Sequence, residues 1–135
     1  MSELLCLQIA MALWLAHVLV QVLVARSEFG DDYLFSSRDE QRQPKGTVCG
    51  RASRALENYV QNLVPFVALD LALIAVGNVG GMGATIWIIA RILYFPAYLA
   101  GVKFLRTGLW LISIIGLIMM FVQLMQAGAD AGLAV

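Results

Sequence analysis

The chain alternates long apolar stretches with short polar segments. Four stretches with few charged residues cover residues 4–25, 59–79, 84–101 and 107–129. A helix needs roughly 17–25 mostly apolar residues to cross the hydrocarbon core of a bilayer, so each stretch is long enough. We therefore predict an all-α, four-transmembrane-helix bundle, an integral membrane protein with a single domain over residues 1–135. The expected helices cover about residues 3–25, 48–77, 83–101 and 106–129.

Charged residues are unevenly shared among the connections between these helices. The first connection, about residues 26–47, is long and basic, and the third contains Lys103 and Arg106, whereas the second, residues 77–83, has no charge. Because basic residues collect in cytoplasmic connections, we expect the first and third connections in the cytoplasm and both termini outside it. The basic residues of the first connection suit anionic lipid headgroups, but such residues often act only as topology signals. They are Arg26, Arg38, Arg42 and Lys45.

Composition narrows the classes of partner. Hydrophobic residues make up 61% of the chain, and 9 basic residues balance 9 acidic ones, so the formal net charge is zero. Without a basic surplus or a reader motif, nucleic-acid binding has no support. No residues have the spacing of metal ligands, and the single histidine, His17, is expected to pack inside the bundle. Membrane lipids are therefore the expected surroundings of this protein.

Polar side chains interrupt two of the expected membrane helices, and on each helix they share one face. Their spacing of three or four residues is that of one side of an α-helix. Ionisable groups inside a bilayer are unfavourable and mark functional sites by default. Guanidinium and amide groups together suit a small ligand that carries carboxylates. These residues are Arg51, Arg54, Asn58 and Gln61 on the second helix, and Arg91, Tyr94 and Tyr98 on the third.

Arg91 needs a partner at membrane depth, and the sequence offers two. Asp70 lies at a similar depth on the second helix, and an ion pair with it would satisfy both charges without any ligand. Alternatively, Arg91 faces the polar side chains near Gln61 and a bound anion. Helical phase favours the second arrangement and charge balance favours the first, so the sequence leaves both open.

Arg106 begins the fourth expected helix, at the end of the bundle where the basic residues gather, and Thr107 follows it. A guanidinium a few ångströms from a thiol favours the ionised form of that thiol. A small thiol bound beside Arg106 is therefore expected to be a thiolate, which is the nucleophilic form.

Three motifs follow one another along the chain. They are Arg54-Ala55-x-x-Asn58-x-x-Gln61 with Pro65-Phe66, then Arg91-x-x-Tyr94-x-x-x-Tyr98, and Arg106 at the start of the fourth helix. In this order they resemble the motifs of the MAPEG family, the membrane-associated proteins of eicosanoid and glutathione metabolism. The resemblance covers nearly the whole chain, and the segment Tyr98-Leu99-Ala100-Gly101 is most similar to the short bacterial members.

The resemblance implies a homotrimer in a bacterial inner membrane, with glutathione sites between subunits that open toward the cytoplasm. It implies that Arg106 activates the thiol of glutathione, with Thr107 as a second donor. Lipophilic substrates would then reach the site through the bilayer. The residues implied to bind glutathione as cosubstrate are Arg54, Asn58, Gln61, Arg91, Tyr94 and Tyr98.

One residue departs from the family pattern. The family usually has glutamate at the position of Gln61, so the hydrogen bond is kept here but the charge is lost. The resemblance therefore implies first a membrane-embedded, glutathione-dependent transferase or peroxidase that acts on a lipophilic electrophile. The alternative is a non-catalytic lipid- or partner-binding protein of the same fold, which the change at Gln61 favours.

Overall fold

The computed structural model describes residues 1–130, which form five α-helices and no strand. The four long helices are each long and apolar enough to span a membrane. The predicted all-α bundle of four transmembrane helices is therefore confirmed. The helices are α1 Glu3–Phe29, α2 Asp31–Leu34, α3 Thr47–Ala75, α4 Gly81–Ala100 and α5 Lys103–Asp130.

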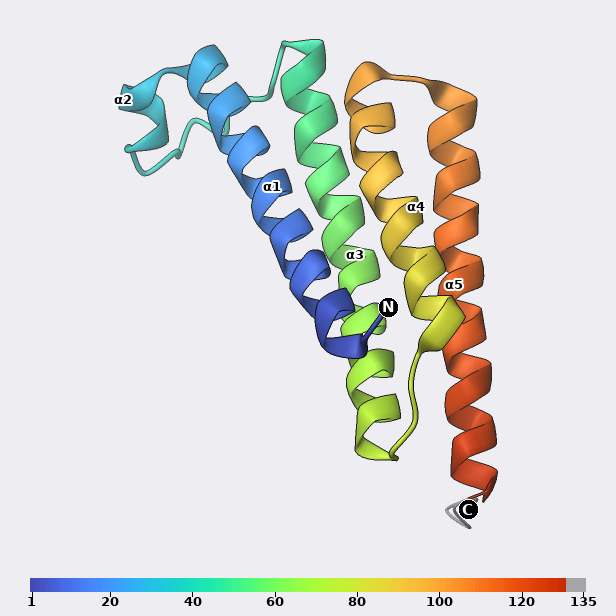
Figure 1. Ribbon diagram of the computed structural model, residues 1–135. Helices are drawn as coiled ribbons and strands as arrows, with labels where there is room; N and C mark the ends of the chain where they lie inside the picture. The colour runs from blue at the N-terminus through green and yellow to red at the C-terminus, as the bar shows by residue number, and fades with distance from the viewer. Residues whose placement is uncertain (131–135) are drawn as a thin grey trace.

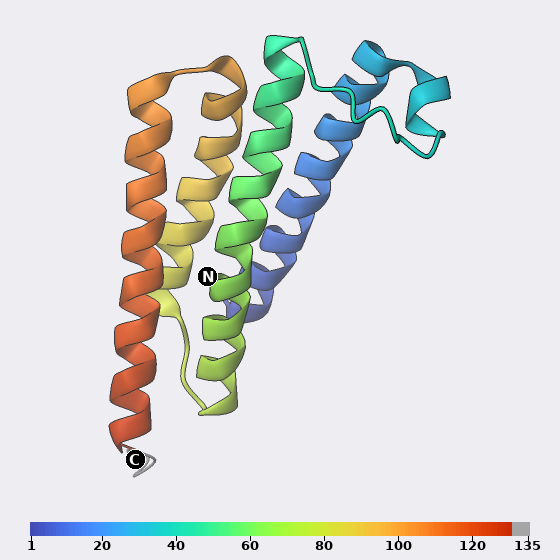
Figure 2. The same ribbon diagram turned by 180° about the vertical axis from the view of Figure 1, so that it is seen from behind.

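The long helices lie side by side, with α3 between α1 and the α4–α5 pair (Figure 1). The connection that contains α2 and the connection from α4 to α5 lie together at one end of the bundle, which we call the loop end. The turn from α3 to α4 and the end of α5 lie at the other end, which we call the turn end (Figure 2). The basic first and third connections thus share one end, as we expect from the alternation of basic and uncharged connections along the sequence.

Helix α1 continues four residues beyond the expected end at residue 25, because a polar side chain in this extension forms a hydrogen bond within the helix. The Ser27 hydroxyl donates to the Val24 carbonyl oxygen at 2.8 Å, and the helix ends only before Gly30, which has φ +77°. The short helix α2 then occupies part of the connection predicted as loop 26–47. Arg26 holds α2 against α1, since its guanidinium pairs with the Asp31 carboxylate at 2.7 Å.

Aromatic rings fill the interior between α1, α3 and α4. The Phe66 and Trp87 rings stack with centroids 3.9 Å apart, and both side chains are fully buried. The Tyr59 hydroxyl donates to the Ala10 carbonyl oxygen at 2.7 Å, which joins α3 to α1. His17 lies with its ring stacked on Tyr59, is 1% exposed and accordingly belongs to the core, as expected from the sequence.

Two glycines let α4 and α5 approach each other closely. A Cβ atom added to Gly116 would lie 2.7 Å from the Gly83 carbonyl oxygen and 3.0 Å from the Trp87 backbone nitrogen. A Cβ atom added to Gly83 would lie 2.8 Å from the Gly116 carbonyl oxygen. Small residues at such contacts are the usual means by which membrane helices pack, because lipid tails compete equally well for large apolar side chains.

Gly116→Ala is expected to destabilise the bundle, whereas Gly108→Ala in the same helix is expected to be neutral or stabilising. Nothing lies within 4 Å of a Cβ atom added to Gly108. Alanine otherwise favours a helix over glycine by about 1 kcal/mol, but overpacking a closed contact costs about 1–3 kcal/mol. Thermal melting of both variants in detergent measures the difference. Equal melting temperatures would contradict the close contact between α4 and α5.

Candidate functional site

A cleft of about 280 Å³ opens near the loop end of the bundle, between α3, α4 and α5. Helix α3 contributes Asn58, α4 contributes Tyr94 and Tyr98, and α5 contributes the other three lining residues. Five of the eight residues predicted for the site line this one cleft. The lining residues are Asn58, Tyr94, Tyr98, Arg106, Thr107 and Trp110.

Arg91 lies behind the cleft and reaches it through Asn58. Its Nη1 donates to the Asn58 side-chain oxygen at 2.9 Å, and its side chain is 1% exposed. The guanidinium also lies 5.7 Å from the Trp87 ring centroid and 5.1 Å from that of Tyr94, within the range of cation–π attraction. Arg91 therefore faces the polar side chains of α3, where its hydrogen-bond partner is Asn58 and not Gln61.

Asp70 is turned away from Arg91 and toward α1. Its side chain is fully buried and lies beside the Glu3 carboxyl group, which itself accepts from the Gly81 backbone nitrogen at 3.3 Å. Within residues 1–130, the ion pairs do not include one between Asp70 and Arg91. The ion pair between Arg91 and Asp70, which the sequence left open, is thus not formed.

Arg106 supplies the cationic group of the cleft. Its guanidinium carbon lies 5.0 Å from the Tyr98 ring centroid, and that ring is 5.4 Å from the Tyr94 ring. Among residues 1–130, no carboxylate pairs with Arg106, so its positive charge is available at the cleft. The Thr107 hydroxyl donates to the Lys103 carbonyl oxygen at 3.0 Å, which leaves its oxygen lone pairs for other donors. A guanidinium beside phenol and amide groups can hold an anionic ligand.

Arg54 and Gln61 do not line the cleft in the single chain. Both follow the helical spacing that also contains Asn58, but both side chains are exposed on the surface of α3. A Cβ atom added to Gly50 would lie 3.2 Å from Arg54 Nη1, so the Arg54 side chain folds back along its own helix. The single chain does not bring these two residues into the cleft, so their predicted role at the site stays a prediction.

Arg51 has a structural task that the spacing pattern did not indicate. Its Nη1 donates to the Leu99 carbonyl oxygen at 3.1 Å, which satisfies the C-terminal end of α4. Gly101 ends that helix with φ +79°, and a Cβ atom there would lie 2.5 Å from the Arg51 guanidinium. Arg51 thus anchors the last turn of α4, which carries Tyr98. A glycine directly after an apolar helix is the signal that could have located this contact.

Trp110 lines the cleft but is not among the eight residues predicted to bind glutathione or to act on it; the sequence suggests it only as a generic lipid-facing residue of the fourth helix that could influence substrate choice. It follows Arg106 by four residues, so the two share a face of α5. That spacing could have identified it, but a tryptophan near the end of a membrane helix is also typical of the interface between lipid and water.

One comparison with known proteins, against protein-family models, gives a match that agrees with the fold. The sequence model of the MAPEG family matches residues 4–126, which include every long helix nearly in full. A comparison with curated proteins gives no match, and a comparison with solved structures gives none either. Since the family match covers most of the chain, this four-helix membrane protein belongs to the MAPEG family.

Proposed function

We propose that this protein is a glutathione-dependent transferase or peroxidase that acts on a lipophilic electrophile. The observation that carries the proposal is the position of Arg106, which presents a guanidinium without a carboxylate partner among residues 1–130 in a cleft lined by two tyrosines. Membership of a family of glutathione and eicosanoid metabolism supports the choice of thiol.

The chemistry assigned to Arg106 is stabilisation of a thiolate. With glutathione in the cleft, the thiol proton leaves to solvent and the sulfur keeps the electron pair beside the guanidinium. In a transfer reaction this pair forms a bond to an electrophilic carbon, and the leaving group departs with the electrons of the broken bond. The Thr107 hydroxyl donates to the Lys103 carbonyl oxygen and would serve as a donor to the sulfur only after turning away from that oxygen, whereas Tyr98 lines the cleft beside the Arg106 guanidinium.

The rest of the tripeptide is assigned to the deeper wall of the cleft. Asn58 is held by Arg91 at 2.9 Å, so its amide is oriented before a ligand arrives. Pre-oriented polar groups lose less entropy on binding than mobile ones. Arg54 and Gln61 continue the same face of α3 and are the proposed contacts for a carboxylate and the amine of glutathione.

A homotrimer would complete the site. Helix α3 exposes a stripe of apolar residues, Val60, Val64 and Leu71, next to the exposed Gln61. A second copy packed near this stripe would cover the open side of the cleft and enclose Arg54 and Gln61. The loop end would face the cytoplasm in a bacterial inner membrane, and lipophilic substrates would enter the cleft from the bilayer.

Gln61 supports a second candidate, a non-catalytic protein that binds a lipid or a protein partner. A neutral amide there attracts the amine of glutathione less strongly than a carboxylate would. The two candidates differ in one property, since only the enzyme stabilises a thiolate in the cleft.

Arg106→Ala is expected to abolish thiolate formation while the protein stays folded. The substituted side chain is half-exposed and makes no ion pair among the described residues, so its loss leaves the core intact. Ultraviolet difference spectroscopy of the purified protein with added glutathione measures the thiolate band. Arg42→Ala is the control, because Arg42 is exposed, pairs with Glu40 and lies outside the cleft.

The spectrum distinguishes the candidates directly. A thiolate band present in the wild type and in Arg42→Ala, and lost in Arg106→Ala, is the result expected for the enzyme. A band that persists in Arg106→Ala contradicts the role of Arg106. No band in the wild type, together with no glutathione binding in calorimetry, favours the lipid- or partner-binding protein.

Gln61→Glu is expected to tighten glutathione binding. A hydrogen bond to a charged group contributes about 1 kcal/mol more than a neutral one, which corresponds to roughly a fivefold lower Kd. Isothermal titration calorimetry measures the change. The matched control is Gln43→Glu, which makes the same change at an exposed position in the loop before α3, outside the cleft. Weaker binding by Gln61→Glu would place this residue outside the glutathione site.

A further inference from the structure

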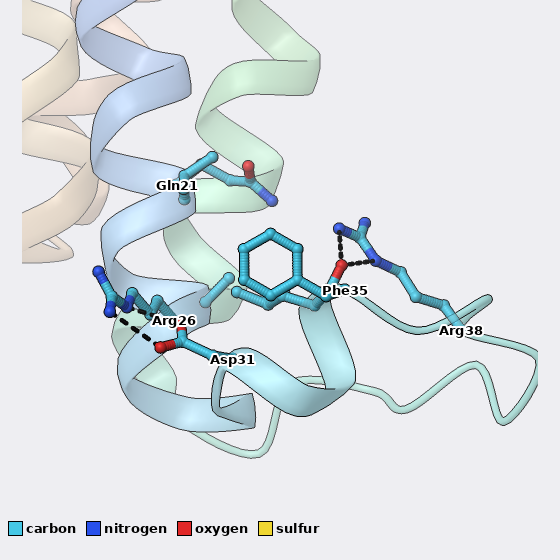
Figure 3. A pocket seen from close by; sticks show the side chains of 8 residues that line it. Gln21, Arg26, Asp31, Phe35 and Arg38 are labelled. Carbon is cyan, nitrogen blue, oxygen red and sulfur yellow. Dashed lines mark hydrogen bonds and ion pairs between the residues drawn. The ribbon is translucent and has the colours of Figure 1, made fainter.

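A second cavity, of about 390 Å³, lies at the loop end between α1 and α2, away from the cleft. Figure 3 shows that the Arg26–Asp31 pair lies on one side of it and Arg38 on the other, with the Phe35 ring between them. Gln21 extends from α1 at the edge nearer the bundle. The proposed glutathione chemistry uses none of these residues.

The cavity lies at the depth of lipid headgroups. The apolar stretch of α1 ends at Ala25, about 22 residues after it begins at Leu4, and such a stretch spans about 30 Å of hydrocarbon. The next residue, Arg26, lines the cavity. Whatever occupies this space is therefore in contact with the polar surface of one membrane leaflet.

The cavity carries one unneutralised positive charge. Arg26 is paired with Asp31 through two contacts of 2.7 and 2.8 Å, so these two charges cancel. Arg38 donates from Nε and Nη2 to the Leu34 carbonyl oxygen at 3.3 and 3.0 Å, and among residues 1–130 it has no carboxylate partner. Hydrogen bonds to a carbonyl oxygen orient a guanidinium without neutralising its charge, and the N–H groups of Nη1 remain free to donate.

The backbone at Arg38 supports a specific placement of this side chain. Arg38 has φ +58°, a left-handed conformation that residues other than glycine adopt at some cost. This conformation turns the side chain back to the Leu34 carbonyl oxygen at the cavity, where Figure 3 shows it.

An apolar track leads from the cavity along α1. Leu15, Leu19 and Val22 follow one another at spacings of four and three residues, so they lie on one face of the helix. Their exposed fractions are 52%, 61% and 47%, and Val22 also lines the cavity. Phe35 is 88% exposed at its edge, which is unfavourable in water but suits the boundary of a bilayer.

We propose that this cavity binds the headgroup of one phospholipid with a single negative charge, with an acyl chain along Leu15, Leu19 and Val22. The phosphate group would accept from Arg38, and the single free charge of the cavity matches the single charge of the lipid. This assignment is independent of the function of the cleft, and it is more specific than a general attraction between a basic loop and anionic lipids.

The test is native mass spectrometry of the full-length protein released from membranes of equal parts phosphatidylglycerol and phosphatidylcholine. Both lipids contain a phosphodiester, but only phosphatidylglycerol has a net negative charge. We expect the wild type to retain phosphatidylglycerol about tenfold in excess, and Arg38→Gln to lose most of this preference. Arg42→Gln, in the same loop but outside the cavity, is expected to keep it within twofold. Inorganic phosphate at millimolar concentration is expected not to displace the lipid.

Four results would overturn the proposal. They are an equal loss of preference in Arg38→Gln and Arg42→Gln, retention of both lipids in equal amounts by the wild type, displacement of the lipid by inorganic phosphate, and covalent crosslinking of two copies through Phe35→Cys. The first would indicate diffuse attraction, and the last a second copy of the chain over the cavity. Unchanged melting temperatures of the two arginine variants exclude unfolding as the cause of any difference.

Discussion

The hydrogen bond between Arg91 and Asn58 is the interaction on which the site depends. A guanidinium that is 1% exposed within a membrane-spanning bundle strongly destabilises a protein unless polar partners satisfy it. Here Nη1 donates to the Asn58 amide oxygen at 2.9 Å and the cation lies over the faces of Trp87 and Tyr94, while Nε and Nη2 have no hydrogen-bond partner among the described residues. The bond fixes α3 against α4 at one depth and one rotation. Tyr94 therefore meets Asn58 in the same cleft, and Tyr98 follows one turn later.

The two ends of the bundle are built for different purposes. Toward the turn end, α4 and α5 touch through Gly83 and Gly116, and stacked rings fill the space beside α3. Toward the loop end, α4 stops at Gly101 under the Arg51 guanidinium, and α5 starts with exposed and half-exposed side chains that leave the cleft open. Close glycine contacts and stacked rings thus support polar groups that are free to meet a ligand, which is the arrangement a binding site requires.

Helical spacing predicted much of the site because membrane helices are regular. Periods of three and four residues placed Asn58, Tyr94 and Tyr98 on facing sides, and the structure brings them together. The choice between Asp70 and the polar side chains near Gln61 as the partner of Arg91 depended on the relative rotation of two helices, which no single-helix pattern contains. Arg54 and Gln61 have the right spacing but stay exposed, because the sequence does not say which surfaces a second copy covers.

The most direct test is an electron cryomicroscopy map of the full-length protein in a lipid nanodisc with added glutathione. The proposed function predicts density for the tripeptide in the cleft, with its sulfur beside the Arg106 guanidinium and its backbone near Asn58. A cleft filled by an acyl chain, or empty of glutathione at saturating concentration, would contradict it. The same map counts the subunits around the site and shows whether Arg54 and Gln61 reach the ligand.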